Sequence, residues 1–334
     1  MTETPSRAAD AVSPGGGTSP VSTARRDAGA PTPARTPLKR RRMSRRARRD
    51  AFVFLAFAAP NLVLIAMFTY RPLFLNIQYS LLDWTLGSTT ATFIGLDNYI
   101  EFFTSEAGLT SLRITVIFTV FTVGGAMVLG LLIALALNIN IPGRTLARSA
   151  VFAPYVLSGV GVGLVWLFIF DPNFGVLSWI LGRLGLGSPE WFLDPDMSLI
   201  MVMIVYVWKN LGYCAIVYLG GLQSLPQDVM HAAQLDGAGA VRRFFSISIP
   251  LLSPTTFFLL ITTTLNSLQA FDLLRIMTPT GRGTNTMIFE SYLQAFGGYS
   301  RAGYSATISV LLFVILIVMT VAQILFVERK VHYS

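Results

Sequence analysis

Residues 224–254 read SLPQDVMHAAQLDGAGAVRRFFSISIPLLSP, a polar segment that lies between two strongly apolar runs. Ser224 is followed three residues later by Gln227, the spacing of a capping box, and Pro226 falls in the first helical turn. The pattern therefore predicts a short helix over residues 225–235. A polar helix held between two hydrophobic runs indicates an ordered insert on one side of a membrane.

The insert continues with a turn and a second predicted helix. Asp236–Gly237 ends the first helix, because glycine tolerates the left-handed conformation that follows a helix C-terminus. The second helix is predicted over 238–249, and Pro250 marks the start of the next apolar run. Two interpretations remain open. The insert could rest on the membrane surface, but its small, flat HAAQLDGAGA stretch favours a groove on another protein.

The composition identifies a membrane protein. The chain has 334 residues, of which 53% are hydrophobic and 13% charged. Apolar runs of about 20 residues are long enough to span a bilayer. Six such spans are predicted, at approximately 51–70, 115–138, 150–170, 198–220, 250–271 and 304–326. The predicted fold is all-α, a polytopic protein with six transmembrane helices.

The net charge of +8 belongs to the N-terminal tail. Residues 1–50 hold twelve basic and four acidic residues, while the remainder of the chain is balanced at thirteen of each. The tail is rich in Pro, Ala, Thr and Gly and is predicted to be disordered. Its run RTPLKRRRMSRRARRD could bind nucleic acid, but a position beside the first span favours anionic lipid instead, with no nucleic-acid partner.

The distribution of basic residues predicts the topology. With the tail inside, eighteen Lys and Arg residues are cytoplasmic and six are external. The positive-inside rule then places both termini in the cytoplasm, and the insert as well. The predicted organisation is a basic cytoplasmic tail (1–50), a first transmembrane helix with an extracytoplasmic segment (51–110), a permease core (111–327) with the insert at 224–249, and a cytoplasmic C-terminus (328–334).

The sequence gives little indication of an enzyme active site. The single Cys214 excludes an intrachain disulfide, and with His231 and His332 it forms no recognisable metal cluster. A phosphate-binding P-loop needs a lysine after a glycine, but the three lysines follow Leu, Trp and Arg. No cofactor is therefore expected on this chain. If ATP drives transport, ATP and Mg must be used by a separate subunit.

The insert resembles the cytoplasmic loop of importer-type ABC transporter permeases, in which E-A-A-x-x-D-G-A precedes I-x-L-P. The residues that match this loop, or stand in its pattern, are His231, Ala232, Ala233, Asp236, Gly237, Ala238, Ile247, Ile249 and Pro250. Two departures are a histidine in place of the first glutamate and Ile249 in place of leucine. The histidine removes any salt link that the glutamate would make.

The resemblance extends from about residue 50 to the C-terminus. It includes FTYRPLFLNIQYSLLDW (68–84), FIGLDNYIEFF (93–103), VWKNLGY (207–213) and TTFFLLITTTLNSLQAFD (255–272). These stretches are similar to the A-type permeases that take up glycerol-3-phosphate and glycerophosphodiesters, within the sugar-permease family related to maltose permeases. The resemblance implies the fold of a type I ABC importer permease in a bacterial plasma membrane.

The resemblance also implies a role for the insert as a coupling helix that docks on a cytoplasmic ATPase. Gly237 would set the angle between the two helices, and the three alanines would allow close approach. Phe244, Phe245 and Ile247 would anchor the insert to the spans, with Arg242 nearby. The implied partners are a second homologous permease, a homodimeric ATPase and an external substrate-binding protein.

Polar residues inside the predicted spans are candidates for the substrate path, because such groups are costly in a bilayer and usually face a cavity or a partner helix. The candidates are Tyr206, Lys209, Asn210, Tyr213, Thr262, Asn266, Gln269 and Asp272. The Lys209 cation would suit a phosphate-bearing substrate. Alternatively, Lys209 and Asn210 hold helices together, or Lys209 pairs with Asp272 or a partner subunit.

Three functions compete. The first is an ATP-driven importer subunit for glycerol-3-phosphate or a glycerophosphodiester such as glycerophosphocholine. The second, in the same family, is a permease for an uncharged sugar such as maltose or trehalose. The third is an ATP-independent secondary transporter or a membrane scaffold, although no internal repeat of the kind common in secondary transporters is evident.

Overall fold

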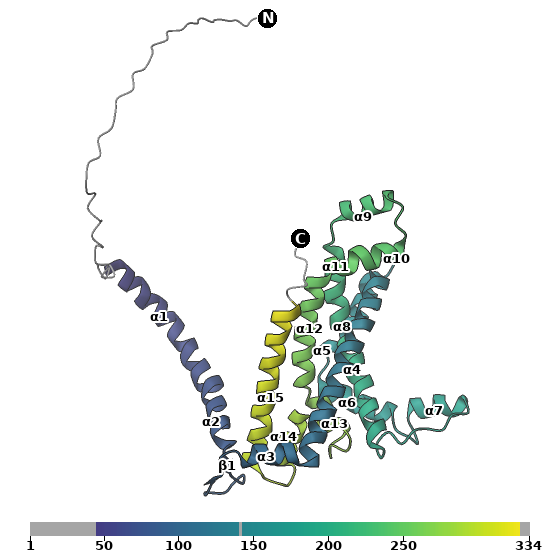
Figure 1. Ribbon diagram of the computed structural model, residues 1–334. Helices are drawn as coiled ribbons and strands as arrows, with labels where there is room; N and C mark the ends of the chain where they lie inside the picture. Colours follow the sequence, from purple (N-terminus) through teal and green to yellow (C-terminus); the bar gives the residue numbers. More distant parts are fainter. Residues whose placement is uncertain (1–44, 140–141, 328–334) are drawn as a thin grey trace, which may run out of the picture. The chain divides into compact units, whose positions relative to one another are not determined.

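The computed structural model describes residues 45–139 and 142–327 (Figure 1). Most of the predicted N-terminal tail and the predicted cytoplasmic C-terminus lie outside these residues. The chain divides into two units, residues 1–59 and 60–334. Helix α1, Arg45–Ile65, begins inside the segment predicted to be a disordered tail, and it crosses from the first unit into the second.

Five helical segments are long and apolar enough to cross a membrane: Phe52–Tyr79, Glu106–Leu137, Pro195–Gln223, Ser253–Met277 and Ala302–Leu325. A sixth is the bent pair Arg144–Val156 and Gly159–Ile169. The prediction of six spans is met when this pair counts as one. The mainly helical, polytopic fold class is confirmed.

The elements follow one another along the chain in this order. After α1 come η1 (Ala66–Tyr70), α2 (Arg71–Tyr79), β1 (Leu82–Asp83), β2 (Thr92–Phe93), α3 (Asp97–Thr104), α4 (Glu106–Leu137), α5 (Arg144–Val156), α6 (Gly159–Ile169), α7 (Val176–Arg183) and α8 (Pro195–Gln223). The second half holds α9 (Gln227–Leu235), α10 (Ala240–Arg243), η2 (Phe244–Ser248), α11 (Ile249–Leu251), α12 (Ser253–Leu268), α13 (Asp272–Met277), α14 (Met287–Phe296), α15 (Ala302–Ala322) and η3 (Gln323–Val327).

The third span departs from its prediction as one helix over 150–170. α5 begins earlier, at Arg144, and α6 is bent away from it by 99°. Leu157 and Ser158 between them have extended backbone. Pro154 removes one helical hydrogen bond just before the break, and the glycines that open α6 are poor helix formers.

Other spans are longer than predicted, most clearly the first two. The first continues to Tyr79, so Arg71 lies in a helix rather than in an external loop. α4 begins at Glu106, which places Arg113 inside it as well. The π-helical turn η1 ends two residues before Pro72, and η2 ends two residues before Pro250. A wider turn accommodates a proline that lacks its N–H group, which explains how the chain stays helical at both prolines.

The core of residues 60–334 forms where α4 packs along α8. Phe118 on α4 and Met201, Val202 and Val205 on α8 are fully buried. Small residues allow the helices to approach closely. A side chain at Gly130 would overlap Cys214, and one at Gly212 would overlap the Val151 backbone of α5.

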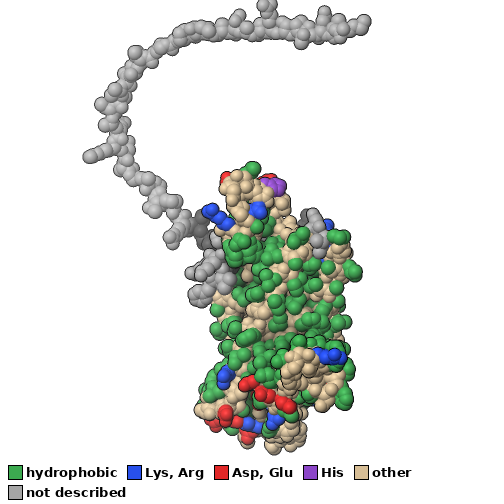
Figure 2. Space-filling model, turned by 90° about the vertical axis from the view of Figure 1, so that its right-hand side faces the viewer, with side chains coloured by type: hydrophobic (Ala, Val, Ile, Leu, Met, Phe, Trp, Pro, Cys, Tyr) green, Lys and Arg blue, Asp and Glu red, His purple; other side chains and the backbone are tan. Residues whose placement is uncertain are grey.

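Hydrophobic and charged side chains occupy different parts of the surface. Hydrophobic side chains cover the middle of the face seen in Figure 2, and charged residues lie toward its two ends. α9 and α10 lie at one end of the helices in Figure 1. β1, α3 and α14 lie at the other, here called the distal end. A hydrophobic belt between two polar ends is the pattern of a protein that spans a bilayer.

Candidate functional site

Two broken helices meet at a polar cavity of about 420 Å³ inside the helices, here called the inner cavity. One break lies between α5 and α6, and the other lies at residues 269–271 between α12 and α13. α6 packs against α13, and a Cβ at Gly159 would lie 3.1 Å from Cβ of Asp272. Irregular backbone at membrane depth is tolerated where it lines such a cavity.

Six of the eight predicted path residues line the inner cavity: Tyr206, Lys209, Asn210, Asn266, Gln269 and Asp272. Tyr213 and Thr262 do not line it. The Tyr213 hydroxyl lies 3.4 Å from Thr262 Oγ1, and the Tyr213 ring stacks on Tyr155 at 4.9 Å between ring centroids. The i, i+4, i+7 spacing thus brings Asn266 and Gln269 to the cavity, but not Thr262.

Lys209 is held at the end of the broken helix. Its Nζ donates a hydrogen bond of 3.0 Å to the backbone oxygen of Tyr155, one of the last carbonyls of α5, and lies 5.5 Å from the centroid of the Tyr155 ring. The final carbonyls of a helix lack intrahelical donors and carry partial negative charge. Lys209 therefore joins α8 to α5 and also lines the cavity.

The predicted pairing of Lys209 with Asp272 is not formed. Both side chains line the inner cavity, but no ion pair joins them in the part of the chain that the structure describes. Asn210 donates to Tyr206 O on its own helix at 2.8 Å and so does not hold two helices together. The Tyr206 hydroxyl does cross between helices, to Asn266 O of α12 at 2.9 Å.

Sequence reasoning missed five residues that line the inner cavity: Tyr155, Gly159, Ala270, Phe271 and Leu273. Pro154 and the following glycines were a signal for the α5–α6 break, but they are also common in unbroken membrane helices. The three residues from α13 and the turn before it are apolar, and nothing in their pattern distinguishes them from residues that face lipid.

The predicted coupling insert forms a helix, a tight turn and a second helix. α9 ends at Leu235, and Gly237 has a positive φ of 76°. Gly237 N donates to Gln234 O and Ala238 N donates to Ala233 O, both at 3.0 Å. These two bonds form the Schellman motif that ends a helix at glycine. The predicted role of the Asp236–Gly237 turn in ending the helix is confirmed.

Several details of the insert differ from the predictions. Ser224 is the C-cap of α8, and its hydroxyl donates to Gly221 O, so the predicted capping box with Gln227 is wrong. α8 runs to Gln223, and the extended Pro226 precedes α9 instead. The second helix begins at Ala240 rather than at residue 238 and continues through η2.

The surface of the insert is partly apolar. Leu235 is 90% exposed and Val241 is 72% exposed. Phe245, predicted to anchor the insert, is 62% exposed, whereas Phe244 and Ile247 are half-buried as an anchor requires. His231, Ala232, Asp236, Gly237 and Arg242 are exposed, and Ala233, Ala238 and Pro250 are half-buried.

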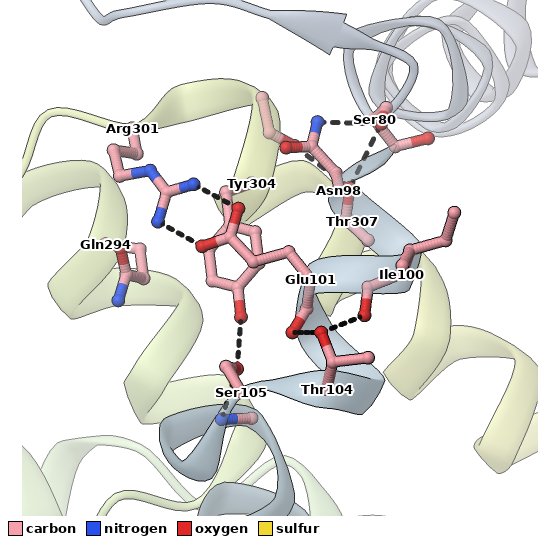
Figure 3. Close-up of polar contacts among 12 residues, drawn as sticks. Ser80, Asn98, Ile100, Glu101, Thr104, Ser105, Gln294, Arg301, Tyr304 and Thr307 are labelled. Carbon is pink, nitrogen blue, oxygen red and sulfur yellow. Dashed lines mark hydrogen bonds and ion pairs between the residues drawn. The ribbon is translucent and has the colours of Figure 1, made fainter. Parts of the chain in front are cut away.

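At the distal end, an ion pair fastens α3 to the start of α15 (Figure 3). Arg301 donates to both carboxylate oxygens of Glu101, at 2.7 and 2.6 Å, and its guanidinium carbon lies 4.4 Å from the centroid of the Tyr304 ring. Nearby, Asn98 donates to the backbone oxygens of Ser80 and Leu82. The hydrogen bonds to Glu101 raise the pKa of Arg301. This arginine is therefore charged throughout the physiological pH range.

Comparisons with known proteins agree with this architecture. Residues 126–332 match the family model for the binding-protein-dependent transport system inner membrane component. The chain is 35% identical over 281 residues to the sn-glycerol-3-phosphate transport system permease protein UgpA of Agrobacterium fabrum (strain C58), covering 83% of this chain and 94% of that protein. UgpA of Brucella abortus is 34% identical over 279 residues, with the same coverage.

Solved structures support the fold. A bacterial ABC transporter that imports the acidic polysaccharide alginate has a chain with a TM-score of 0.74 and 22% identity, covering 84% of this chain and 96% of that one. A second structure of the alginate transporter, in complex with alginate pentasaccharide-bound periplasmic protein, has a TM-score of 0.72 and 21% identity. The ABC importer permease fold is confirmed.

These matches decide between the classes of function. They confirm a transport subunit rather than an enzyme, and a multi-pass protein of the bacterial plasma membrane. They also exclude the ATP-independent secondary transporter and the membrane scaffold. The chain belongs to the family of inner membrane components of binding-protein-dependent transport systems, the permease subunits of ABC importers.

Proposed function

We propose that this permease forms half of the translocation path for a phosphate ester of glycerol, either glycerol-3-phosphate or a glycerophosphodiester. The observation that carries the proposal is Lys209, which presents a cation to the inner cavity where two broken helices meet. A cation at membrane depth is costly and usually marks a transport path. The relatives named as glycerol-3-phosphate permeases agree with a phosphate ligand.

The charge balance of the inner cavity favours a phosphodiester. Lys209 and Asp272 are the charged residues among those that line it. A phosphate monoester carries close to two negative charges near neutral pH, and the second would be repelled by Asp272. A diester carries a single charge, and a cationic head group such as choline would suit Asp272 and the faces of Tyr155, Tyr206 and Phe271.

The coupling role is part of the same proposal. The insert at α9–α10 docks on a cytoplasmic ATPase, and the exposed Leu235 and Val241 supply apolar contact area. The ATPase is a homodimer that binds ATP and Mg. A second homologous permease completes the path, and an external binding protein delivers the substrate at the distal end. This arrangement places both termini and the insert in the cytoplasm.

Reconstitution of the full complex tests the proposal. We would measure ATPase stimulation by binding protein loaded with glycerol-3-phosphate, glycerophosphocholine, maltose or trehalose. Stimulation by a phosphate ester is expected, with glycerophosphocholine above glycerol-3-phosphate. K209Q is expected to reduce this stimulation by about tenfold, because one charge-assisted contact is lost, and K209R is expected to retain most of it.

Each alternative has its own outcome in this assay. Stimulation by maltose or trehalose alone would overturn the phosphate ester and keep the importer. A complex that purifies without any ATPase would overturn the coupling role of the insert. Equal activity of K209Q and the wild type would show that Lys209 serves only to join α8 to α5.

A further inference from the structure

A second, larger cavity of about 790 Å³ opens at the distal end, beside α13 and α14. It is here called the distal cavity. Its polar lining includes Arg275, Thr280, Asn285, Glu290 and Arg301. None of these five residues lines the inner cavity.

Two of the charged residues in the distal cavity already have side-chain partners. Arg301 is held by both oxygens of Glu101. Glu290 is 5% exposed, and its two carboxylate oxygens accept hydrogen bonds of 2.8 Å from the amides of Asn285 and Gln294. The side chains of Arg301 and Glu290 are therefore held in place by their hydrogen-bond partners.

Arg275 differs from its neighbours. Its guanidinium carbon lies 5.4 Å from the centroid of the Tyr292 ring, and its side chain is half-buried. No carboxylate lies within ion-pair distance of Arg275 among the described residues. A guanidinium that contacts an aromatic ring and has no carboxylate partner keeps N–H donors available, and their fork geometry matches a phosphate group.

One short helix borders both cavities. Asp272, at the start of α13, lines the inner cavity, and Arg275 on the same helix lines the distal cavity. Between them lies an aromatic pair. Phe271 lines the inner cavity, Tyr292 lines the distal one, and their rings meet edge to face at 5.0 Å. A ligand at Arg275 is therefore separated from the inner cavity by two aromatic side chains.

We propose that the distal cavity is a second binding site for the phosphate group of the transported ester, with Arg275 as its cation. The substrate occupies this site first and then passes the Phe271–Tyr292 pair to reach Lys209. This inference rests on the proposed phosphate-ester function. It adds a site that the substrate occupies before the inner one. The loss of Arg275 should therefore weaken the binding of substrate more than it lowers the maximal rate of transport.

Direct binding separates the two sites. We would titrate the detergent-solubilised complex, without binding protein, with glycerol-3-phosphate and with inorganic phosphate by isothermal titration calorimetry. The wild-type permease is expected to bind two equivalents of glycerol-3-phosphate, and R275Q and K209Q one each. Inorganic phosphate should bind where Arg275 is present. If R275Q binds as many equivalents as the wild type, the distal site is refuted.

Transport kinetics give a second readout. In proteoliposomes, R275Q is expected to raise the concentration of loaded binding protein needed for half-maximal uptake by about tenfold, with the maximal rate retained. R275K should remain close to the wild type. R183Q is the matched control, because Arg183 also lies over an aromatic ring, Trp179 at 5.2 Å, but lines neither cavity. Equal half-saturation in R275Q and R183Q would overturn the proposal.

The outcomes also distinguish this inference from the proposed function. Two-site binding in a complex that transports only sugars would refute phosphate-ester transport. It would leave Arg275 as a phosphate-binding residue and overturn its place on the transport path. No binding of glycerol-3-phosphate to the wild type would refute the distal site. A lower melting temperature of R275Q relative to R275K would assign its defect to folding and would contradict a binding role.

Discussion

Lys209 shows how a charged residue is accommodated within a span. A lysine at the centre of a membrane helix costs about 3 kcal/mol in insertion experiments. Here the ammonium contacts the Tyr155 carbonyl and ring, and it borders a polar cavity. The α5 terminus supplies partial negative charge that an unbroken helix would lack. The break in the third span and the lysine in the fourth therefore stabilise each other.

Single glycines at helix crossings determine how closely two helices pack. Gly212 of α8 packs against the α5 backbone, where a Cβ would overlap the Val151 oxygen. We predict that G212A lowers the free energy of unfolding by about 1–3 kcal/mol through overpacking. The measurement is the melting temperature of the purified complex in detergent. G220A is the control on the same helix, since nothing lies within 4 Å of its added Cβ. Equal melting temperatures would contradict this packing.

At the scale of elements, breaks and wide turns shape the permease more than helix length does. The break between α5 and α6 and the break before α13 together create the inner cavity. The π-helical turns η1 and η2 let two helices continue through Pro72 and Pro250. Proline lacks the N–H group that a regular helix needs, and at Pro72 and Pro250 the wider turn accommodates this loss. At the two breaks, the irregular backbone borders a polar cavity, where it is tolerated.

The turn of the insert gives a prediction at this scale. Gly237 has a φ of 76°, and a β-branched residue there would be strained by about 1–2 kcal/mol. We expect G237V to lower substrate-stimulated ATPase activity several-fold while the amount of permease in the membrane is unchanged. ATPase assays and immunoblots of membranes measure the two quantities. In G239V the backbone is extended and the site is open, so activity should be kept. A functional G237V would refute the coupling role of the turn.

At the largest scale, the described part of residues 60–334 has a hydrophobic belt that separates two polar ends with different structures. The insert end carries exposed apolar side chains on a turn and two helices. The distal end carries a two-stranded sheet and the Glu101–Arg301 pair, which holds α3 against α15. The same ion pair leaves Arg275 as the unpaired cation of the distal cavity within the described residues.

Cysteine labelling tests the orientation of the whole molecule. Cys214, the single native cysteine, is fully buried and gives a silent background. We predict that L235C on α9 reacts with a membrane-impermeant maleimide only in inverted vesicles, and that F93C on β2 reacts only in spheroplasts. Leu235 is 90% exposed and Phe93 is 74% exposed, so both thiols are accessible. Co-expression of the ATPase should protect L235C. The opposite pattern of labelling would reverse the predicted topology.

The sequence by itself determined the class of fold and the position of the Asp236–Gly237 turn. Apolar runs of membrane length have few alternatives to spanning helices, because backbone groups in a bilayer must bond internally. Asp236–Gly237 also predicted correctly where the helix ends, because a Schellman turn depends on the conformation of a few neighbouring residues. Lys209, Asn266 and Gln269 could be found for a similar reason, since polar residues in apolar runs are rare and conspicuous.

Only the tertiary structure decided where the helices break and which residues the breaks bring together. Pro154 and Pro250 carry the same local signal, yet one lies just before a bend of 99° and the other lies within a continuing helix. Pro154 is followed by two extended residues and a glycine-rich helix start, whereas a π-helical turn precedes Pro250. The inner and distal cavities likewise depend on contacts between α6, α13 and α14. The sequence alone did not identify Arg275, because its contact with the Tyr292 ring and its lack of an ion-pair partner among the described residues both depend on the tertiary structure.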